Sequence, residues 1–310
     1  MADTLHYVGR ARFAPVRTWE RLYESLAWPY ILALPFMYAI GFYVMLKKAL
    51  LKALGIEVQL NCWFVDGLSI NSRRMKEGAT RWPSLNTCYN FSVGEGRTAL
   101  HRALDTCWMH IRNAQAVRNR LKIAKRELAV AVRAIGAPGR PVRILSLAAG
   151  TAQGVIEVAA ESKRFGIDCE IVLVDHDVTA LRYARDLADR NGVEIKTIEG
   201  NVLMFNKFIG PFTADIVEMM GFLDYLDGTL GEKLLRKIWR HLQSGSYFFC
   251  CHIHPNGERY FLKYVVDWDS GMLYRTVPEF KEVLHKGNFL TPRIVTEPLG
   301  IHSVSVARKE

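Results

Sequence analysis

The feature that most constrains the fold is an alternation of strands and helices after the breaker "GAPGRP" at 136–141. Strands are predicted near 142–148, 169–175, 194–200, 214–220, 246–253, 291–296 and 301–307. Helices are predicted from about 153 and over 178–191, 230–242 and 277–286. Repeated units of this length predict a parallel, doubly wound, Rossmann-like sheet with helices on both faces. Residues 139–310 are therefore assigned to one α/β domain.

A lipophilic segment lies near the N-terminus. Residues 25–46 carry no charged side chain. Their length fits a membrane span, whereas Pro29 and Pro35 argue against a regular one. Three interpretations stay open: a span, a helix lying in the membrane interface, and a buried helix that covers a lipophilic pocket. Residues 1–55 are assigned to this helical segment.

The intervening residues 56–138 are interpreted as a mainly helical cap or lid, which makes the N-terminal extension helical as a whole. Gly, Asn, Ser and Pro scattered through 56–98 predict irregular structure there. Apolar side chains at helical spacing predict one long helix over 99–135.

Composition narrows the partners and the compartment. The net charge of +10 favours anionic partners, and much of the positive charge lies between 112 and 143. No aromatic side chains are interleaved with this basic run, which argues against sequence-specific nucleic-acid binding. The six cysteines have no CxxC spacing, which fits a reducing cytoplasm. No metal site is expected, because no acidic third ligand lies near His252 and His254.

The first strand leads into a candidate cofactor loop, "RILSLAAGTAQG" at 143–154. A ligand in such a sheet binds beyond the carboxyl ends of the strands. Gly150 lies at the turn, and Asp175 ends the second strand, where a carboxylate can accept hydrogen bonds from ribose hydroxyls. Ala148 and Ala152 stand where a dinucleotide loop would have glycines. The loop therefore favours S-adenosylmethionine over a dinucleotide.

These segments resemble the class I S-adenosylmethionine-dependent methyltransferases. "LSLAAGTAQG" resembles the family's first motif, "VLVDHD" its second-strand acid, "IEGNV" the segment beside adenine, and "IVEMMGFLDYL" its fourth strand. The resemblance implies a seven-stranded sheet with an antiparallel last strand. It implies that the cofactor is bound by Ser146, Ala148, Gly150, Thr151, Asp175, His176, Gly200, Asn201, Val202, Met219 and Met220.

One position departs from the family pattern. The family commonly has an acid where this sequence has Ser146, and that acid helps to orient the methionine end of the cofactor. Binding of the methionine end is therefore expected to rest more on backbone groups.

A narrower resemblance covers "RNAQAVRNRL", "GFLDYL" and "HPNGERYFLKYVVDWDSGMLYRTVPEF". These segments are similar to a bacterial methyltransferase group that includes the 3-hydroxy fatty acid methyl ester synthases. The resemblance implies a fatty-acid-like acceptor.

Methyl transfer to a hydroxyl needs a base, whereas a carboxylate acceptor needs only positioning and a clamp. Candidate catalytic residues near the ends of the fourth and fifth strands are His254, His252, Asp224 and Tyr225. Candidate substrate-binding residues are Arg259, Tyr274, Arg275 and Arg118. Capping, packing and salt bridges are the alternative roles, and for Arg118 and Arg120 the alternative is a solvated basic face.

The sequence thus predicts an S-adenosylmethionine-dependent methyltransferase acting on a lipophilic small molecule, with O-methylation of a fatty-acid-like carboxylate or hydroxyl favoured. Two alternatives remain: a nucleic-acid binder or RNA methyltransferase that uses the basic helix, and a degenerate scaffold at a membrane. The expected location is the cytoplasm, with possible attachment to the inner, anionic face of the membrane.

Overall fold

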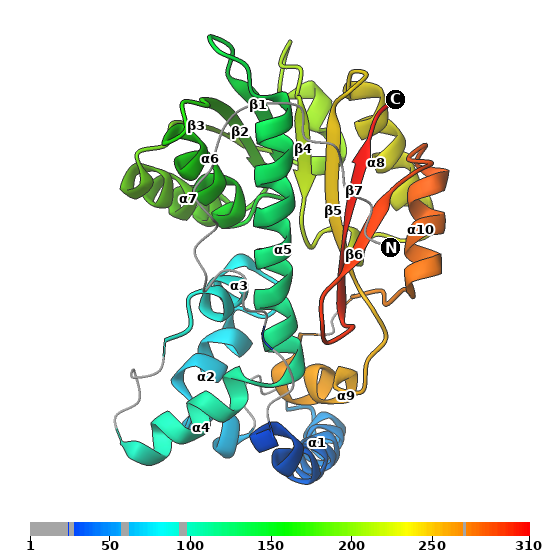
Figure 1. Ribbon diagram of the computed structural model, residues 1–310. Coiled ribbons are helices and arrows are strands. Elements are labelled where there is room, and N and C mark those ends of the chain that lie inside the picture. The colour runs from blue at the N-terminus through cyan, green and yellow to red at the C-terminus, as the bar shows by residue number, and fades with distance from the viewer. Residues whose placement is uncertain (1–23, 25–27, 57–61, 93–97, 269–270) are drawn as a thin grey trace.

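The computed structural model describes residues 24, 28–56, 62–92, 98–268 and 271–310. At its centre is a seven-stranded sheet in the order β3-β2-β1-β4-β5-β7-β6 (Figure 1). The strands are β1 (Val142–Leu147), β2 (Cys169–Asp175), β3 (Ile195–Glu199), β4 (Ile216–Met219), β5 (Tyr247–Ile253), β6 (Arg293–Thr296) and β7 (His302–Arg308). The first five strands pair in parallel, and β7 pairs antiparallel with β5 and β6. The predicted doubly wound sheet with an antiparallel last strand is confirmed.

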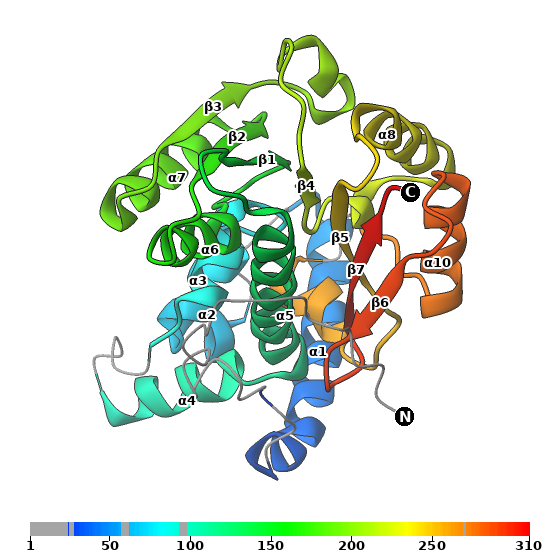
Figure 2. The same cartoon turned by 45° about the horizontal axis from the view of Figure 1, so that its top comes forward.

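Helices cover both faces of this sheet, as Figure 2 shows. One face packs against α5 (Arg112–Ile135), α6 (Gln153–Lys163) and α7 (Val178–Asn191). The other packs against η3 (Val202–Lys207), α8 (Gly228–His241) and α10 (Val277–Lys286). Each face of the sheet has its own hydrophobic core, and successive apolar side chains of β1 point to opposite faces. Ile144 packs into the core on the α6 side, and Leu145 packs into the core on the α8 side. α7 and α10 begin and end where the sequence predicted them.

The loop between β1 and α6 has an unusual backbone. Ala148, Gly150 and Ala152 all have positive φ, at 50°, 52° and 48°. Such a conformation costs an L-residue roughly 1–2 kcal/mol, whereas glycine adopts it freely. The loop therefore has the path of a glycine-rich turn, although two of its three left-handed positions are alanine.

A helical cap lies at one end of the sheet in Figure 1. It consists of α1 (Trp28–Ala53), η2 (Trp63–Gly67), α2 (Ile70–Glu77), α3 (Trp82–Tyr89), α4 (Ala99–Met109), α9 (Arg259–Phe261) and η5 (Leu262–Val266). The prediction of irregular structure over 56–98 was wrong for the described part, because two of the residues that suggested loops begin helices. Ser69 caps α2 through its side chain, and Pro83 lies in the first turn of α3.

The single helix predicted over 99–135 is two helices, α4 and α5, that meet at His110 and Ile111. The carbonyls that end α4 are satisfied by side chains of α5: Arg118 Nη2 donates to Met109 O at 2.9 Å, and Gln115 Nε2 donates to His110 O. These contacts stabilise the break, because the last carbonyls of a helix have no partner within the helix.

The lipophilic segment forms α1, although residues 1–23 and 25–27 of the assigned segment lie outside the described part. The stretch Leu34–Ala53 is long and apolar enough to cross a membrane by length and composition. One side of α1 packs against α9 and η5 through Met37 and Val44. Gly41 lets α1 approach closely, since a Cβ there would lie 2.7 Å from the Tyr260 ring. Large apolar side chains on α1 are exposed: Phe36, Tyr38, Phe42, Tyr43, Leu46 and Leu50.

Candidate active site

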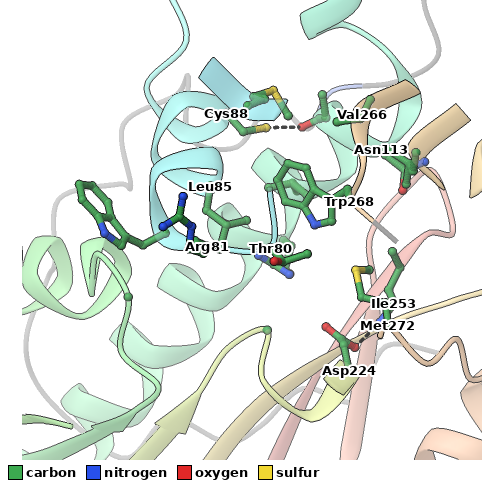
Figure 3. A pocket seen from close by; sticks show the side chains of 18 of the residues that line it. Thr80, Arg81, Leu85, Cys88, Asn113, Asp224, Ile253, Val266, Trp268 and Met272 are labelled. Atoms are coloured by element: carbon green, nitrogen blue, oxygen red, sulfur yellow. Dashed lines mark hydrogen bonds between the residues drawn. The ribbon is translucent and has the colours of Figure 1, made fainter. Parts of the chain in front are cut away.

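A cavity of about 410 Å³ lies between the carboxyl ends of the strands and the helical cap. Loops after β1, β2 and β4 form one wall, and α2, α3, α4 and α5 form another. Figure 3 shows side chains from both walls facing one another, with Asp224 on the sheet side and Trp268, Leu85 and Cys88 on the cap side. This placement fits the general rule that doubly wound sheets bind ligands at their carboxyl edge.

One end of the cavity is formed by the predicted cofactor loop. Ala148, Gly150, Asp175 and His176 all line it. The Asp175 carboxylate is buried and accepts hydrogen bonds from Gly150 N at 2.8 Å and Asp177 N at 2.9 Å. It thereby fastens the β1 loop to the β2 loop and fixes the backbone where a nucleoside would lie.

Trp82 at the start of α3 covers this end and was not among the predicted site residues. It lines the cavity, and a Cβ on Gly150 would lie 3.8 Å from the Trp82 Cβ. The indole donates to Thr179 Oγ1 at 2.9 Å and packs against Tyr183 at 4.9 Å between ring centroids. The "WP" pair at 82–83 signals a helix start, but only the folded chain shows that this helix reaches the loop.

A smaller side chamber of about 70 Å³ opens beside the loop. Thr151, Glu218 and Arg120 line it, and Arg120, Ala148 and Met220 line both the chamber and the main cavity. Ser146 is fully buried below the chamber and donates from its hydroxyl to Glu218 Oε2 at 2.5 Å. An acid thus lies next to the position where the sequence lacks one, on β4 instead of β1.

The environment of Glu218 raises its pKa into the physiological range. Burial raises the pKa of Glu218 to about 7, although hydrogen bonds from Ser146 and the Met220 amide and the nearby Arg120 cation act in the opposite direction. The side chain is partly exposed, and it lines the side chamber.

Two of the predicted catalytic residues, Asp224 and Tyr225, line the cavity. The Asp224 carboxylate accepts from Ile253 N at 3.0 Å and contacts His252 Nδ1. Burial alone would raise the pKa of Asp224, but the adjacent His252 lowers it below its usual value. Asp224 is therefore a fixed anion in the cavity wall.

His302 also lines the cavity and was not among the predicted residues. Its side chain is almost fully buried, and neither ring nitrogen has a hydrogen-bond partner among the described residues. Burial and the nearby Arg120 cation hold the pKa of His302 well below its usual value. The imidazole is thus neutral at physiological pH. It begins β7, far from the motifs in sequence, and no local pattern marks it.

The other two predicted catalytic residues, His252 and His254, lie behind the cavity wall and do not line it. Both ring nitrogens of His254 are engaged, Nδ1 with Arg275 O at 2.7 Å and Nε2 with Ser303 Oγ at 2.6 Å. His252 lies between Asp224 and Arg275. Through these contacts both histidines hold the residues of the cavity wall in place from behind.

The predicted substrate-binding residues in the segment after β5 also lie outside the cavity. The Arg259 guanidinium stacks over the Tyr274 ring at 4.4 Å. Arg275 donates to Leu223 O at 3.2 Å and Leu226 O at 2.7 Å, so it fastens the loop that carries Asp224.

Arg118 on α5 is neither a substrate-binding residue in the cavity nor part of a solvated basic face, which were the two roles considered for it. Arg118 is buried outside the cavity, where its Nε donates to Glu24 Oε1 at 2.7 Å, and Arg120 is buried as well. Other cations of α5 pair with acids, as Lys125 does with Glu157. The solvated basic face was therefore a wrong expectation for Arg118 and Arg120.

Five predicted cofactor residues are absent from the described cavity lining: Ser146, Gly200, Asn201, Val202 and Met219. Gly200 N donates to Asp175 O at 2.9 Å, and Asn201 caps η3 through its side chain. Val202 and Met219 are buried in the core on the α8 side of the sheet. Their contacts hold the ends of β2 and β4 in position without reaching the cavity.

The raised pKa of Glu218 predicts a pH-dependent stability. Because the folded pKa of about 7 exceeds the ordinary value of 4.5, the unfolded chain releases this proton first, and stability falls between these pH values. Ionisation of Glu218 should lower the free energy of unfolding of wild type by up to roughly 3 kcal/mol above pH 7, and Glu218→Gln should remove this loss. Thermal unfolding of ligand-free protein should show the variant gaining more stability over wild type at pH 8 than at pH 5. Equal destabilisation at both pH values would contradict this account.

Comparison with known proteins agrees with this geometry. A family model described as "Putative methyltransferase" matches residues 42–206, just over half of the chain. The crystal structure of a possible exported protein from Bordetella parapertussis is similar at 16% identity, covering 75% of this chain and 80% of that one, with a TM-score of 0.61. The CMeT domain of the citrinin polyketide synthase is similar at 15% identity, covering 79% and 67%, with a TM-score of 0.52. No curated protein matches the sequence.

At these identities the structural neighbours establish the fold alone. The family match covers the end of α1, η2, α2 to α5, the cofactor loop and the first three strands. The chain therefore belongs to this putative methyltransferase family and has the class I S-adenosylmethionine-dependent methyltransferase fold.

Proposed function

We propose that the protein transfers a methyl group from S-adenosylmethionine to a hydroxyl of a lipophilic, fatty-acid-like small molecule. The observation that carries this proposal is the continuous cavity from Asp175 to Trp268, which joins a polar cofactor end to an apolar chamber. The apolar chamber is the feature that supports a lipophilic acceptor.

The residues at the cofactor end fit S-adenosylmethionine. The Asp175 carboxylate suits ribose hydroxyls, and the Trp82 indole offers an apolar cover for a purine. Ala148 and Gly150 bring the loop backbone to the cavity wall. When bound, the cofactor supplies a methyl group that is electrophilic because it is attached to a sulfonium.

The acceptor end is lined mainly by apolar side chains from the cap, from α5 and from the segment after β5. They include Val65, Met75, Trp108, Val117, Phe261, Leu262, Val266, Trp268 and Met272. Such a surface gains free energy when it is covered by an acyl chain or ring system. This chamber supports a lipophilic acceptor, and it also excludes water from the reacting groups.

The polar groups at the boundary favour a hydroxyl acceptor. A hydroxyl must lose its proton, and neutral His302 can accept one at a ring nitrogen. The Asp224 carboxylate in the same wall would stabilise the resulting imidazolium and repel a carboxylate acceptor. A carboxylate acceptor, which the resemblance to methyl ester synthases suggests, is the second candidate and would need no base.

The cofactor assignment predicts a loss of binding on Asp175→Ala. Calorimetric titration with S-adenosylhomocysteine should show one site in wild type and at least roughly tenfold weaker binding in the variant, because the fixed anion is lost. Glu199→Ala is the matched control, since Glu199 pairs with Asp175 in register but is exposed outside the cavity. Failure of wild type to bind would leave a non-catalytic scaffold at a membrane as the better hypothesis.

The acceptor assignment predicts the effect of His302→Asn. With a hydroxyl acceptor, loss of the base should lower methyl transfer into a lipid extract by roughly 100-fold or more, with S-adenosylhomocysteine affinity nearly unchanged. His241→Asn is the control, because His241 is half-buried outside the cavity. Unchanged transfer by the His302 variant would instead favour a carboxylate acceptor.

We also propose that the exposed apolar side of α1 lies on an anionic membrane surface, where it would meet lipophilic acceptors. Its other side packs against α9 and η5, which favours an interfacial helix over a span. The net charge of +10 supports attraction to anionic lipid.

The combined change of Phe36, Tyr43 and Leu50 to serine should abolish co-sedimentation with phosphatidylglycerol vesicles, because these exposed residues supply the apolar contact. Leu290→Ser, at a residue that is 69% exposed on the sheet domain, should leave co-sedimentation unchanged. Equal binding by the triple variant would exclude this role for α1.

A further inference from the structure

Arg120 is a buried cation that forms no direct ion pair among the described residues, although Asp224 and Glu218 attract it at longer range. Its side chain is 4% exposed and lines both the main cavity and the side chamber. Nη2 donates to Tyr89 Oη at 2.9 Å, and Nη1 donates to Cys251 Sγ at 3.6 Å. Burial raises the pKa of Tyr89 above its usual value and that of Cys251 to about 12, so both partners are neutral at physiological pH.

Within the described part of the chain, no carboxylate lies within ion-pair distance of the Arg120 guanidinium. A guanidinium has five N–H donors, and burial without a directly paired anion is unfavourable. The position of Arg120 at the wall of the side chamber therefore points to an anionic group of a ligand.

Glu218 lines the same side chamber and has the opposite charge when ionised. It faces Ser146 across β1 and β4, which pair in register at these two residues. Ser146 holds one carboxylate oxygen through its hydroxyl, at 2.5 Å, and does not itself line the chamber. The acid that reaches the chamber beside the cofactor loop is therefore on β4.

We propose that Glu218 and Arg120 together hold the amino-acid end of the cofactor, Glu218 receiving the ammonium and Arg120 the carboxylate. The inference rests on the proposed use of S-adenosylmethionine. A zwitterionic α-amino acid carries both charges on one carbon, and the side chamber presents one side chain of each sign beside the loop. Ser146 is a positioning residue in this arrangement, because it acts through Glu218.

The same cation could instead receive a carboxylate of the methyl acceptor, since Arg120 also lines the main cavity. The adjoining Thr151, Gly150 and Ala148 of the cofactor loop favour the cofactor. Binding of the cofactor product alone, with no acceptor present, separates the two assignments.

The test compares S-adenosylhomocysteine with 5′-methylthioadenosine, which lacks the ammonium and the carboxylate. Titrations of the full chain should show that Glu218→Gln and Arg120→Met each weaken S-adenosylhomocysteine roughly 10- to 100-fold. Binding of 5′-methylthioadenosine should change less than roughly threefold, which also shows that each variant is folded. Arg126→Met, on the same helix and outside the cavity, should behave as wild type.

A swap of the facing pair gives a second readout. Glu218→Ser should lose the preference for S-adenosylhomocysteine over 5′-methylthioadenosine, and Glu218→Ser combined with Ser146→Asp should recover part of it. Recovery would show that an acid near the chamber is needed and not the Glu218 side chain as such. Unchanged binding of 5′-methylthioadenosine by both variants would separate this effect from a change in folding.

The outcomes separate this inference from the proposed function. If wild type binds S-adenosylhomocysteine and both single variants bind it equally well, the Glu218–Arg120 assignment is overturned and the cofactor assignment stands. If Arg120→Met leaves this binding unchanged but abolishes methyl transfer, Arg120 belongs to the acceptor. If wild type binds neither compound, the proposed function itself is wrong.

Discussion

The cavity depends on the capping of α5 by Glu258. The first residues of α5 have no local cap, since Ile111 offers no side-chain acceptor. The buried Glu258 carboxylate accepts from Arg112 N at 2.9 Å and Asn113 N at 2.8 Å, and also from Asn113 Nδ2 at 2.7 Å. A carboxylate at a helix N-terminus is favoured both by hydrogen bonding and by the helix dipole. Because Glu258 begins the segment that continues to Trp268, this contact joins α5 to the apolar wall of the cavity.

The sequence was informative where the structure is determined by residues that are close together in the chain. Strand and helix periodicity predicted the sheet, and the order of loop, turn and acid placed Gly150 and Asp175 together. It was less informative where partners are distant in the chain. The break at His110 depends on Arg118 and Gln115 reaching backwards to α4. His302 and Arg120 reach the cavity only because β7 inserts beside β5 and α5 lies across the sheet.

Positive charge was a misleading guide to the surface at three described positions, because Lys76, Arg118 and Arg120 are buried. Lys76 is fully buried and pairs with Asp66 at 3.0 Å, and Arg118 is buried against Glu24. Such pairs are maintained only where each charge has a partner and hydrogen bonds. Against that background Arg120, with neutral partners and a ligand-sized cavity in front of it, stands apart from the other buried cations.

The most direct measurement follows a labelled methyl group. The protein is incubated with S-adenosylmethionine tritiated in the methyl group, together with a lipid extract and, separately, with RNA. The account predicts label in a hydroxyl-bearing lipid, recovered as its methyl ether, and none in RNA above a heat-denatured control. Label in RNA, or no transfer to any lipid, would contradict it.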